Sequence, residues 1–256
     1  MFFISNCFRN LNRIEFVITY DCTGKCRHCS EGDHKFSGLH LNGDKAAKIL
    51  CDIAEKFNLT SVMTFGGEAL MYPESVIAVH SAAKDIGIPV RQLITNGYFS
   101  HDTGKIKSVA KEIGNCGIND LLLSVDAFHQ ETIPTEPVMC FAEEVSKYAS
   151  VRLNPAWLKS REDNNSCNIK TREILKKFKN LGIPESEGNI IFPEGNALIN
   201  FAEYFDDNEH VNPYKENPDD IKTISIEPDG SVLSGNIFSE NILKILENYN
   251  NERKEN

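Results

Sequence analysis

The segment RIEFVITYDCTGKCRHCS, residues 13–30, decides how the rest of this chain is interpreted. Its first seven residues are rich in β-branched and aromatic side chains, a pattern that predicts a strand running into a loop. The loop holds Cys22, Cys26 and Cys29 within eight residues. Three thiolates so close together favour zinc or an iron–sulfur cluster over calcium or magnesium.

The composition limits the classes of protein to which the chain can belong. Its 256 residues are 41% hydrophobic and 25% charged, which indicates a globular protein with one large domain. A net charge of -10 and a pI of about 5.2 disfavour nucleic acid as a partner. Since no apolar run approaches the roughly 20 residues that span a bilayer and no signal peptide is evident, we expect no membrane association and a cytoplasmic location. In that reducing compartment, clustered cysteines indicate a metal or catalysis rather than disulfides.

Downstream of the cysteines, apolar strands alternate with amphipathic helices. Together with the first strand, this alternation gives six βα-type units and predicts parallel strands joined by right-handed crossovers. The expected helices are 42–58, 74–86, 105–113, 138–148 and 171–181, and the expected strands after the first are 60–65, 90–95, 120–125, 150–157 and 189–192.

Two arrangements fit this alternation: an open doubly wound sheet, or a partial (βα)6 barrel of the TIM type. Polar residues gathered at the C-terminal ends of the strands favour the partial barrel, although periodicity alone does not decide. We expect the barrel to occupy residues 13–200. An extension, 201–256, then comprises an acidic linker, a β-hairpin around Pro-Asp-Gly and a short helix with Ser239 as its N-cap.

The three cysteines are consistent with two kinds of metal site. A structural zinc takes four protein ligands, and His28 or His34 is available to complete a Cys3His set. A ferredoxin-type cluster takes four cysteines, and no fourth cysteine is nearby. A [4Fe-4S] cluster held by three cysteines would leave one iron open to a substrate or cofactor.

Further motifs join the cysteines in a pattern typical of one family. The spacing C-x3-C-x2-C follows the first strand, and Gly66, Gly67 and Glu68 follow the second. The third strand ends in ITNG (94–97) and the fourth in SVDAFHQ (124–130). In these features, residues 13–197 resemble the radical S-adenosylmethionine (SAM) superfamily.

The resemblance implies a [4Fe-4S] cluster and SAM as cofactors. Reductive cleavage of SAM would yield a 5′-deoxyadenosyl radical that removes hydrogen from a substrate. By match to the family motifs, Cys22, Cys26 and Cys29 would ligate the cluster and His28 would lie beside the adenine. The Gly66–Gly67 backbone would approach the methionyl group, and Glu68 would pair with its ammonium.

Residues after the later strands complete the expected site. Ser124 and Asp126 would contact SAM, and Asn96 would support the ribose or simply form an Asx turn. We expect Arg152 to bind the methionyl carboxylate, the alternative being an ion pair with Asp126. Asn154 would bind the ribose. Substrate contact is expected from His129 and Gln130, the candidate catalytic residues, and from Trp157 and Glu194.

The tail from residue 224 onward resembles that of peptide-modifying radical SAM enzymes, whose extensions carry further clusters. No cysteine follows Cys167, so this tail cannot ligate such a cluster through thiolates. We expect a peptide or small-molecule substrate, with flavodoxin or ferredoxin as the electron donor. The alternatives are a glycyl-radical-enzyme activase and, from another class, a zinc-stabilised binding protein without turnover.

Overall fold

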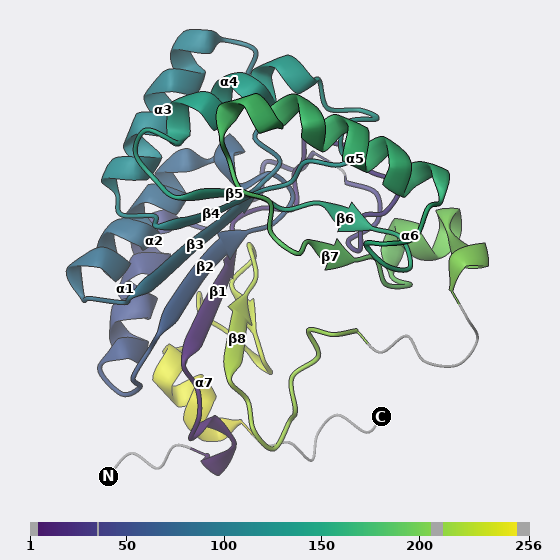
Figure 1. The fold of residues 1–256 in the computed structure, drawn as a ribbon. Helices are drawn as coiled ribbons and strands as arrows, with labels where there is room; N and C mark the ends of the chain where they lie inside the picture. Colours follow the sequence, from purple (N-terminus) through teal and green to yellow (C-terminus); the bar gives the residue numbers. More distant parts are fainter. Residues whose placement is uncertain (1–4, 35, 206–211, 250–256) are drawn as a thin grey trace.

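A computed structural model describes residues 5–34, 36–205 and 212–249 and shows an α/β architecture built on one parallel sheet (Figure 1). Strands and helices alternate from β1 to α5, as the sequence predicts. Their bounds are β1 Arg13–Val17, α1 Gly43–Ala54, β2 Ser61–Phe65, α2 Pro73–Asp85, β3 Val90–Thr95, α3 Thr103–Asn115, β4 Asp120–Leu123, α4 Thr135–Val145, β5 Val151–Leu153 and α5 Ser166–Phe178.

The main sheet has six strands in the order β5-β4-β3-β2-β1-β8, and every neighbouring pair is parallel. Helices α1 to α4 lie along one side of it (Figure 1). A doubly wound sheet would carry helices on both faces. The sheet is curved but not closed, since β5 and β8 are its two edges, so the partial-barrel prediction is confirmed.

The residues of β1 show how the two faces of the sheet differ. Ile14 and Phe16 are fully buried in the hydrophobic core. Arg13 and Glu15 alternate with them and line a cavity on the opposite face. The concave face of the sheet is therefore polar at this level, and the cavity lies within the curve of the sheet.

The segment 150–157, predicted as a single strand, forms two strands in the structure. β5 ends at Leu153, and β6 (Ala156–Trp157) pairs in parallel with β7 (Asn189–Ile190) in a separate two-stranded sheet. Pro155 lies between β5 and β6 and has no N–H with which to continue the ladder. The prediction that residues 189–192 supply the sixth strand of the barrel is therefore wrong.

The sixth strand comes from the C-terminal segment. β8 (Thr223–Ile226) pairs in parallel with β1, so that Arg13 lies opposite Thr223 and Phe16 opposite Ile226. The predicted boundary at residue 200 therefore assigns β1 and β8 to different parts of the chain, although the two strands are neighbours in the main sheet. The linker predicted after that residue lies partly outside the described residues.

The predicted C-terminal hairpin forms with different strands. Its first run is β8, and the hairpin itself pairs β9 (Ser231–Val232) with β10 (Gly235–Asn236). The Pro-Asp-Gly turn therefore connects the main sheet to this hairpin. Helix α7 (Ile242–Asn248) begins after Asn241, whose Oδ1 accepts a hydrogen bond from the Leu243 N–H at 2.9 Å, so Asn241 is the N-cap rather than Ser239.

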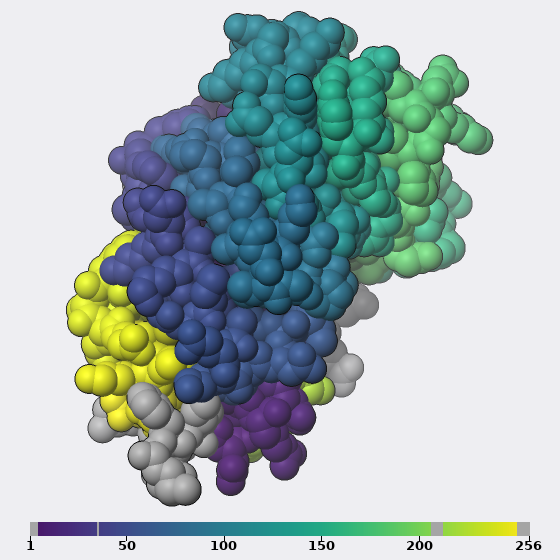
Figure 2. Space-filling model, turned by 90° about the vertical axis from the view of Figure 1, so that its left-hand side faces the viewer, coloured from purple at the N-terminus to yellow at the C-terminus, as the bar shows by residue number. Residues whose placement is uncertain are grey.

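Shorter elements complete the described chain. Helix α7 contacts α1, and Figure 2 shows this C-terminal region (yellow) against the N-terminal half of the molecule. None of the helices in the described ranges combines the length and apolar character that crossing a bilayer requires. The remaining helices are α6 Gly195–Asn200 and the 3-10 helices η1 Asn6–Phe8, η2 Ala69–Met71, η3 Lys179–Leu181 and η4 Ala202–Tyr204.

Candidate functional site

The loop that follows β1 brings all three clustered cysteines to the wall of one cavity of about 1000 Å³. The other predicted residues in the wall belong to the cysteine loop or follow the ends of β2 to β5, except Glu194, which follows β7. Parallel strands end at the same edge of a sheet, which explains why residues distant in sequence meet here. The predicted site residues that line the cavity are Cys22, Cys26, His28, Cys29, Gly66, Gly67, Asn96, Ser124, His129, Asn154 and Glu194.

The three thiols lie in an environment that suits a bound metal. Burial raises the pKa of Cys22 to about 12, and it also raises the pKa values of Cys26 and Cys29. Without a metal, these groups are therefore protonated at neutral pH and are weak nucleophiles. A bound metal offsets the cost of burying thiolates, because its positive charge takes the place of the protons.

The spacing of the ligand atoms separates a cluster from a single zinc ion. A tetrahedral zinc with Zn–S bonds of about 2.3 Å brings its sulfur ligands within roughly 4 Å of one another. In the described part of the chain, the cysteines form no group of three whose ligand atoms all lie within 4.8 Å. A cluster has no such requirement, since each cysteine bonds a different iron. The three cysteines therefore do not form a preformed zinc cage, and three thiols on one loop are a donor set that a cluster can use.

The two histidines considered as fourth ligands lie differently. His34 Nε2 is 3.2 Å from Cys29 Sγ, and its Nδ1 is 2.7 Å from the Tyr20 carbonyl oxygen. The ring of His28 packs against those of Phe128 and His129, with centroid separations of 5.0 and 4.8 Å. Burial lowers the pKa of His28 to about 4, so the ring is neutral at pH 7.

Only His28, Asp126 and His129 bring three candidate ligand atoms within 4.8 Å of one another among the described residues. Asp126 nevertheless has no capacity left for a metal. Its Oδ1 accepts hydrogen bonds from the N–H groups of Phe128 and His129, and its Oδ2 accepts from Ala156 N–H and His129 Nδ1, all at 2.8–2.9 Å. These four bonds use the roughly four acceptor positions of a carboxylate.

Asp126 is thus a buried support for His129 rather than part of the cavity wall. Burial alone would raise the pKa of Asp126, but its interactions with His129 and His28 lower it to about 2. The hydrogen bond between His129 Nδ1 and Asp126 fixes the orientation of the ring. The other ring nitrogen, Nε2, is not bonded to Asp126. Gln130 Oε1 accepts from the Asp126 N–H at 2.8 Å, so Gln130 stabilises this loop and does not line the cavity.

The two glycines after β2 pack against the start of the cysteine loop. A Cβ on Gly66 would lie 2.4 Å from the Thr19 carbonyl oxygen, and one on Gly67 would lie 2.2 Å from that of Asp21. The Gly67 N–H donates to Thr19 O at 2.7 Å. Side chains at these two positions would therefore displace the backbone that leads into Cys22.

Glu68 is fully buried and its carboxylate is occupied by protein donors. Oε1 accepts from Thr95 Oγ1 at 2.7 Å and from the Leu70 N–H at 2.9 Å, and Oε2 accepts from the Asn96 N–H at 2.8 Å. Burial raises the pKa of Glu68, partly offset by these hydrogen bonds. In this structure the side chain joins the loops after β2 and β3, and it does not line the cavity.

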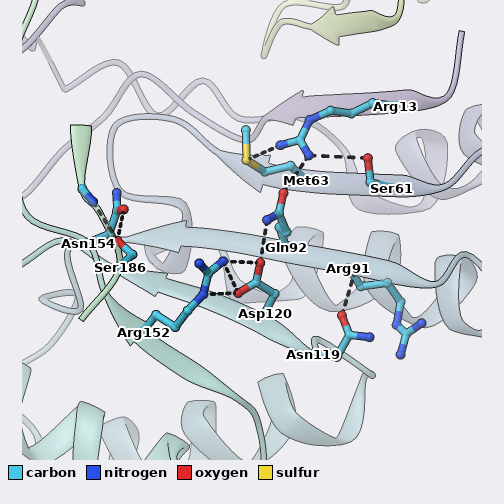
Figure 3. A network of polar contacts seen from close by, with 11 residues as sticks. Arg13, Ser61, Met63, Arg91, Gln92, Asn119, Asp120, Arg152, Asn154 and Ser186 are labelled. Carbon is cyan, nitrogen blue, oxygen red and sulfur yellow. Dashed lines mark hydrogen bonds and ion pairs between the residues drawn. The ribbon is translucent and has the colours of Figure 1, made fainter. Parts of the chain in front are cut away.

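The contacts of Asn96 support the Asx turn. Its Oδ1 accepts from the Tyr98 N–H at 2.8 Å, and its Nδ2 lies 3.7 Å from Cys22 Sγ. Asn96 lines the cavity, and its role toward the ribose stays a prediction. Asn154, which also lines the cavity, accepts a hydrogen bond from Ser186 Oγ at 2.7 Å (Figure 3).

Arg152 pairs with Asp120 and not with Asp126. Its Nη2 lies 2.7 Å from both carboxylate oxygens of Asp120, as Figure 3 shows. Asp120 also accepts from Gln92 Nε2 at 2.6 Å. The alternative prediction, an ion pair between Arg152 and Asp126, is therefore wrong about the partner residue. Arg152 also does not line the cavity.

A set of polar residues on the inner face of the sheet was not predicted as part of the site. Arg13 donates to Glu15 at 2.6 Å and to Gln92 at 2.7 Å, and Ser225 donates to Glu15 at 3.1 Å. All four residues line the cavity (Figure 3 shows Arg13 and Gln92). The available signal was the alternation of Arg13 and Glu15 with apolar residues in β1, which places both charges on one face.

Trp157 belongs to the core. It is 1% exposed, and its Nε1 donates to the Glu187 carbonyl oxygen at 3.0 Å. Substrate contact is therefore not supported for Trp157, whereas Glu194 does line the cavity.

Comparison with known proteins agrees with this geometry. The sequence model of the radical SAM superfamily matches residues 16–207, which is most of the chain. No curated protein sequence matches the chain.

Solved structures share the fold at low sequence identity. SuiB of Streptococcus suis, bound to the precursor peptide SuiA, superposes with a TM-score of 0.60 at 12% identity, covering 93% of this chain and 65% of SuiB. Native anSMEcpe with bound SAM gives 0.59 at 16% identity, covering 94% of this chain and 81% of the other. BtrN in complex with SAM and 2-DOIA gives 0.52 at 13% identity, covering 94% and 83%. The chain thus spans slightly less than two thirds of the length of SuiB.

Proposed function

This chain belongs to the radical SAM superfamily, and on that premise we propose that it is a radical-generating enzyme and that Cys22, Cys26 and Cys29 hold its [4Fe-4S] cluster. The enzyme then abstracts hydrogen from a peptide or small-molecule substrate. The observation that carries this proposal is the convergence of the three cysteines on one cavity with residues from the ends of β2 to β5. The lack of a zinc-like spacing among the three cysteines, within the described residues, supports it.

When bound, the cluster supplies the electron that cleaves SAM to methionine and a 5′-deoxyadenosyl radical. The chain's own residues bind and orient. Gly66 and Gly67 line the cavity with backbone alone, so a ligand can approach their peptide groups closely. Ser124 and Asn154 supply hydrogen-bonding groups to the same cavity, and His28 presents an aromatic ring beside the cysteines.

The deeper part of the cavity is the proposed substrate site. Arg13, Glu15 and Gln92 present charged and amide groups there. Such a wall suits a substrate that carries several hydrogen-bonding groups, such as a peptide. His129 lines the same cavity, and the Asp126 carboxylate holds its Nδ1 at 2.8 Å, so Nε2 is the atom at which a proton would be held or moved. That two structural neighbours were solved with peptides, SuiB with SuiA and anSMEcpe with Cp18Cys, supports the peptide class.

Anaerobic reconstitution with iron and sulfide tests the cluster assignment. The wild-type protein should bind about four irons per chain and release 5′-deoxyadenosine from SAM under dithionite. Cys26→Ala should lose both properties while keeping a folded barrel. The matched control is Cys51→Ala on α1, outside the cavity, which should behave as wild type. Full SAM cleavage by the Cys26 variant, or tight zinc binding without SAM cleavage in the wild type, would refute the assignment.

Product mass spectrometry tests the substrate class. Peptides encoded beside the gene, and separately a panel of small polar metabolites, are incubated with the reconstituted enzyme, SAM and a reduced flavodoxin as the proposed electron donor. A mass change in a peptide only, dependent on SAM, supports the peptide class. A change in a metabolite with no change in any peptide contradicts it.

A further inference from the structure

Helix α6 lies against the cysteine loop, although more than 160 residues separate the two in sequence. The Asn196 N–H donates to the carbonyl oxygen of Cys29 at 2.8 Å, and its Nδ2 donates to that of Cys26 at 3.4 Å. Asn200 Nδ2 donates to Arg27 O at 3.2 Å. One short helix therefore contacts three backbone carbonyls in segment 26–29 of the cysteine loop, and this segment carries two of the three thiols.

Gly195, the first residue of α6, makes the closest approach to this loop. Its φ is +52°, a conformation that favours glycine, and a Cβ built on it would lie 2.3 Å from Ser30 O and 2.5 Å from Cys29 O. Both neighbours are backbone atoms, so they cannot turn aside as a flexible side chain would. Any side chain at position 195 must therefore push the Cys29–Ser30 backbone, and Cys29 Sγ moves with it.

Helix α6 is itself held by buried contacts, so it does not move away from the cysteine loop to relieve the clash. Ala197 is fully buried, and Phe201, directly after α6, is 3% exposed. The ring of Phe201 packs edge-on against that of Phe128, with centroids 5.4 Å apart, and the Arg27 guanidinium lies 5.0 Å above the Phe201 ring. These contacts form a second, smaller hydrophobic core that includes Ala156, Leu158 and Ile191.

The loop is also held on its other side. Arg27 forms a two-pronged ion pair with Glu131 at 2.8 and 2.9 Å, and the Lys25 N–H donates to Thr132 Oγ1 at 3.0 Å. The backbone between Cys26 and Ser30 thus has little freedom to adjust to pressure from α6.

We propose that Gly195 and Asn196 are positioning residues for the cluster, because they fix the backbone of Cys26–Ser30 and so the relative placement of the thiol ligands. The inference rests on the proposed ligand role of Cys22, Cys26 and Cys29. It assigns a role to a part of the chain that supplies no ligand.

Gly182 provides a matched control for Gly195. Its φ is +67°, also in the left-handed region, but no heavy atom lies within 4 Å of a Cβ built there. Gly195→Ala and Gly182→Ala therefore impose similar backbone strain, and only the first presses on the cysteine loop. Each variant is reconstituted anaerobically in the full chain and assayed for iron and sulfide per chain, the electron paramagnetic resonance spectrum of the reduced cluster, and thermal unfolding before reconstitution.

Gly195→Ala should retain less than about one quarter of the wild-type iron, with an altered spectrum of the remainder, because a [4Fe-4S] cluster needs its ligands correctly placed. Gly182→Ala should keep the wild-type iron content and spectrum. Metal-free Gly195→Ala should still unfold cooperatively, but at a lower temperature than metal-free Gly182→Ala, because it alone carries the clash with the cysteine loop. Wild-type iron content and spectrum in Gly195→Ala would overturn the inference.

Asn196→Ala serves if Gly195→Ala does not fold, because it leaves the backbone bond to Cys29 O and removes only the side-chain bonds to Cys26 O and Asp33 Oδ1. Loss of these bonds should speed release of iron to a chelator by about threefold to tenfold. Asn200→Asp, which exchanges the donor to Arg27 O for an acceptor, should act in the same direction. Release at the wild-type rate in both variants would overturn the inference while leaving the ligand assignment intact. A wild-type protein that binds no cluster would instead refute the ligand assignment.

Discussion

Arg152 and Asp120 form a two-pronged ion pair across the β4–β5 boundary, in which Arg152 Nη2 lies 2.7 Å from both carboxylate oxygens and Nε lies 2.9 Å from Oδ1. Gln92 extends the contact to β3 and Arg13 extends it to β1 (Figure 3). The pair therefore belongs to a chain of polar contacts along the inner face of the open sheet. These contacts explain the presence of an arginine at position 152 without any contact with SAM.

The expected effect of Arg152→Ala follows from this pairing. SAM affinity should stay within about twofold, and the free energy of unfolding should fall by about 1 kcal/mol, since the side chain is 39% exposed and solvent screens the pair. Calorimetric titration of the reconstituted protein and urea unfolding measure the two quantities. Arg161→Ala, which removes the ion pairs of a similarly exposed arginine with Glu185 and Glu187, is the control. A loss of SAM affinity above about tenfold would restore Arg152 to the methionyl carboxylate.

Glu68→Gln should destabilise the protein even in the absence of SAM. In either orientation, the new amide NH2 faces a backbone N–H, that of Leu70 or that of Asn96. One buried donor then loses its acceptor, which costs about 1–3 kcal/mol of unfolding free energy. Glu203→Gln, at an exposed position, should change stability by less than about 0.5 kcal/mol. Unchanged stability with weakened SAM binding would instead indicate direct contact between Glu68 and the methionyl ammonium.

Ile226→Ala tests whether β8 is part of the core. Ile226 is fully buried where β8 pairs with β1, so truncation should lower the unfolding free energy by about 2–5 kcal/mol. Ile199→Ala is the matched control, because Ile199 is 78% exposed, and it should cost less than about 0.5 kcal/mol. Equal stabilities of the two variants in urea would show that the C-terminal segment does not pack as described.

His80 should make the protein less stable at acid pH. It is fully buried, with its Nε2 2.9 Å from Thr64 Oγ1, and burial together with the positive charge of Arg91 lowers its pKa to about 3. The unfolded chain binds a proton on this residue below about pH 6.5, whereas the folded protein does not. The titration of His80 therefore leaves the unfolding free energy unchanged above about pH 6.5. Below that pH, the unfolding free energy falls by about 1.4 kcal/mol per pH unit as the pH approaches 3.

Urea unfolding at about pH 7, 6 and 5 measures this dependence. His80→Gln should show a shallower loss of stability over that range than the wild type, because glutamine does not titrate. The same substitution at the exposed His101 controls for the exchange itself. Parallel pH profiles of His80→Gln and the wild type would contradict the assignment.

Local patterns determined the parts of this protein that depend on neighbours in sequence. The alternation of apolar strands and amphipathic helices was sufficient to predict β1 to α4 and helix α5, because the core-facing side of each element is encoded at a period of two or about 3.6 residues. The three cysteines and the glycines after β2 could also be recognised from the sequence, since their chemistry depends on spacing within one loop. Strand ends meet at one edge of a parallel sheet, so the cavity could be predicted in outline.

Only the tertiary structure decided the contacts that join distant segments. Residues 189–192 and 223–226 are both short apolar runs, and nothing local determines which of them pairs with β1. Asp120 and Asp126 offer Arg152 the same carboxylate, and the choice depends on which side chain is already saturated by other donors. The contact of Gly195 with the cysteine loop likewise has no local signal. The sequence by itself thus determined the cysteine motif and the strand–helix alternation. The folded chain determined each long-range partner, because several chemically equivalent candidates compete and packing permits only one.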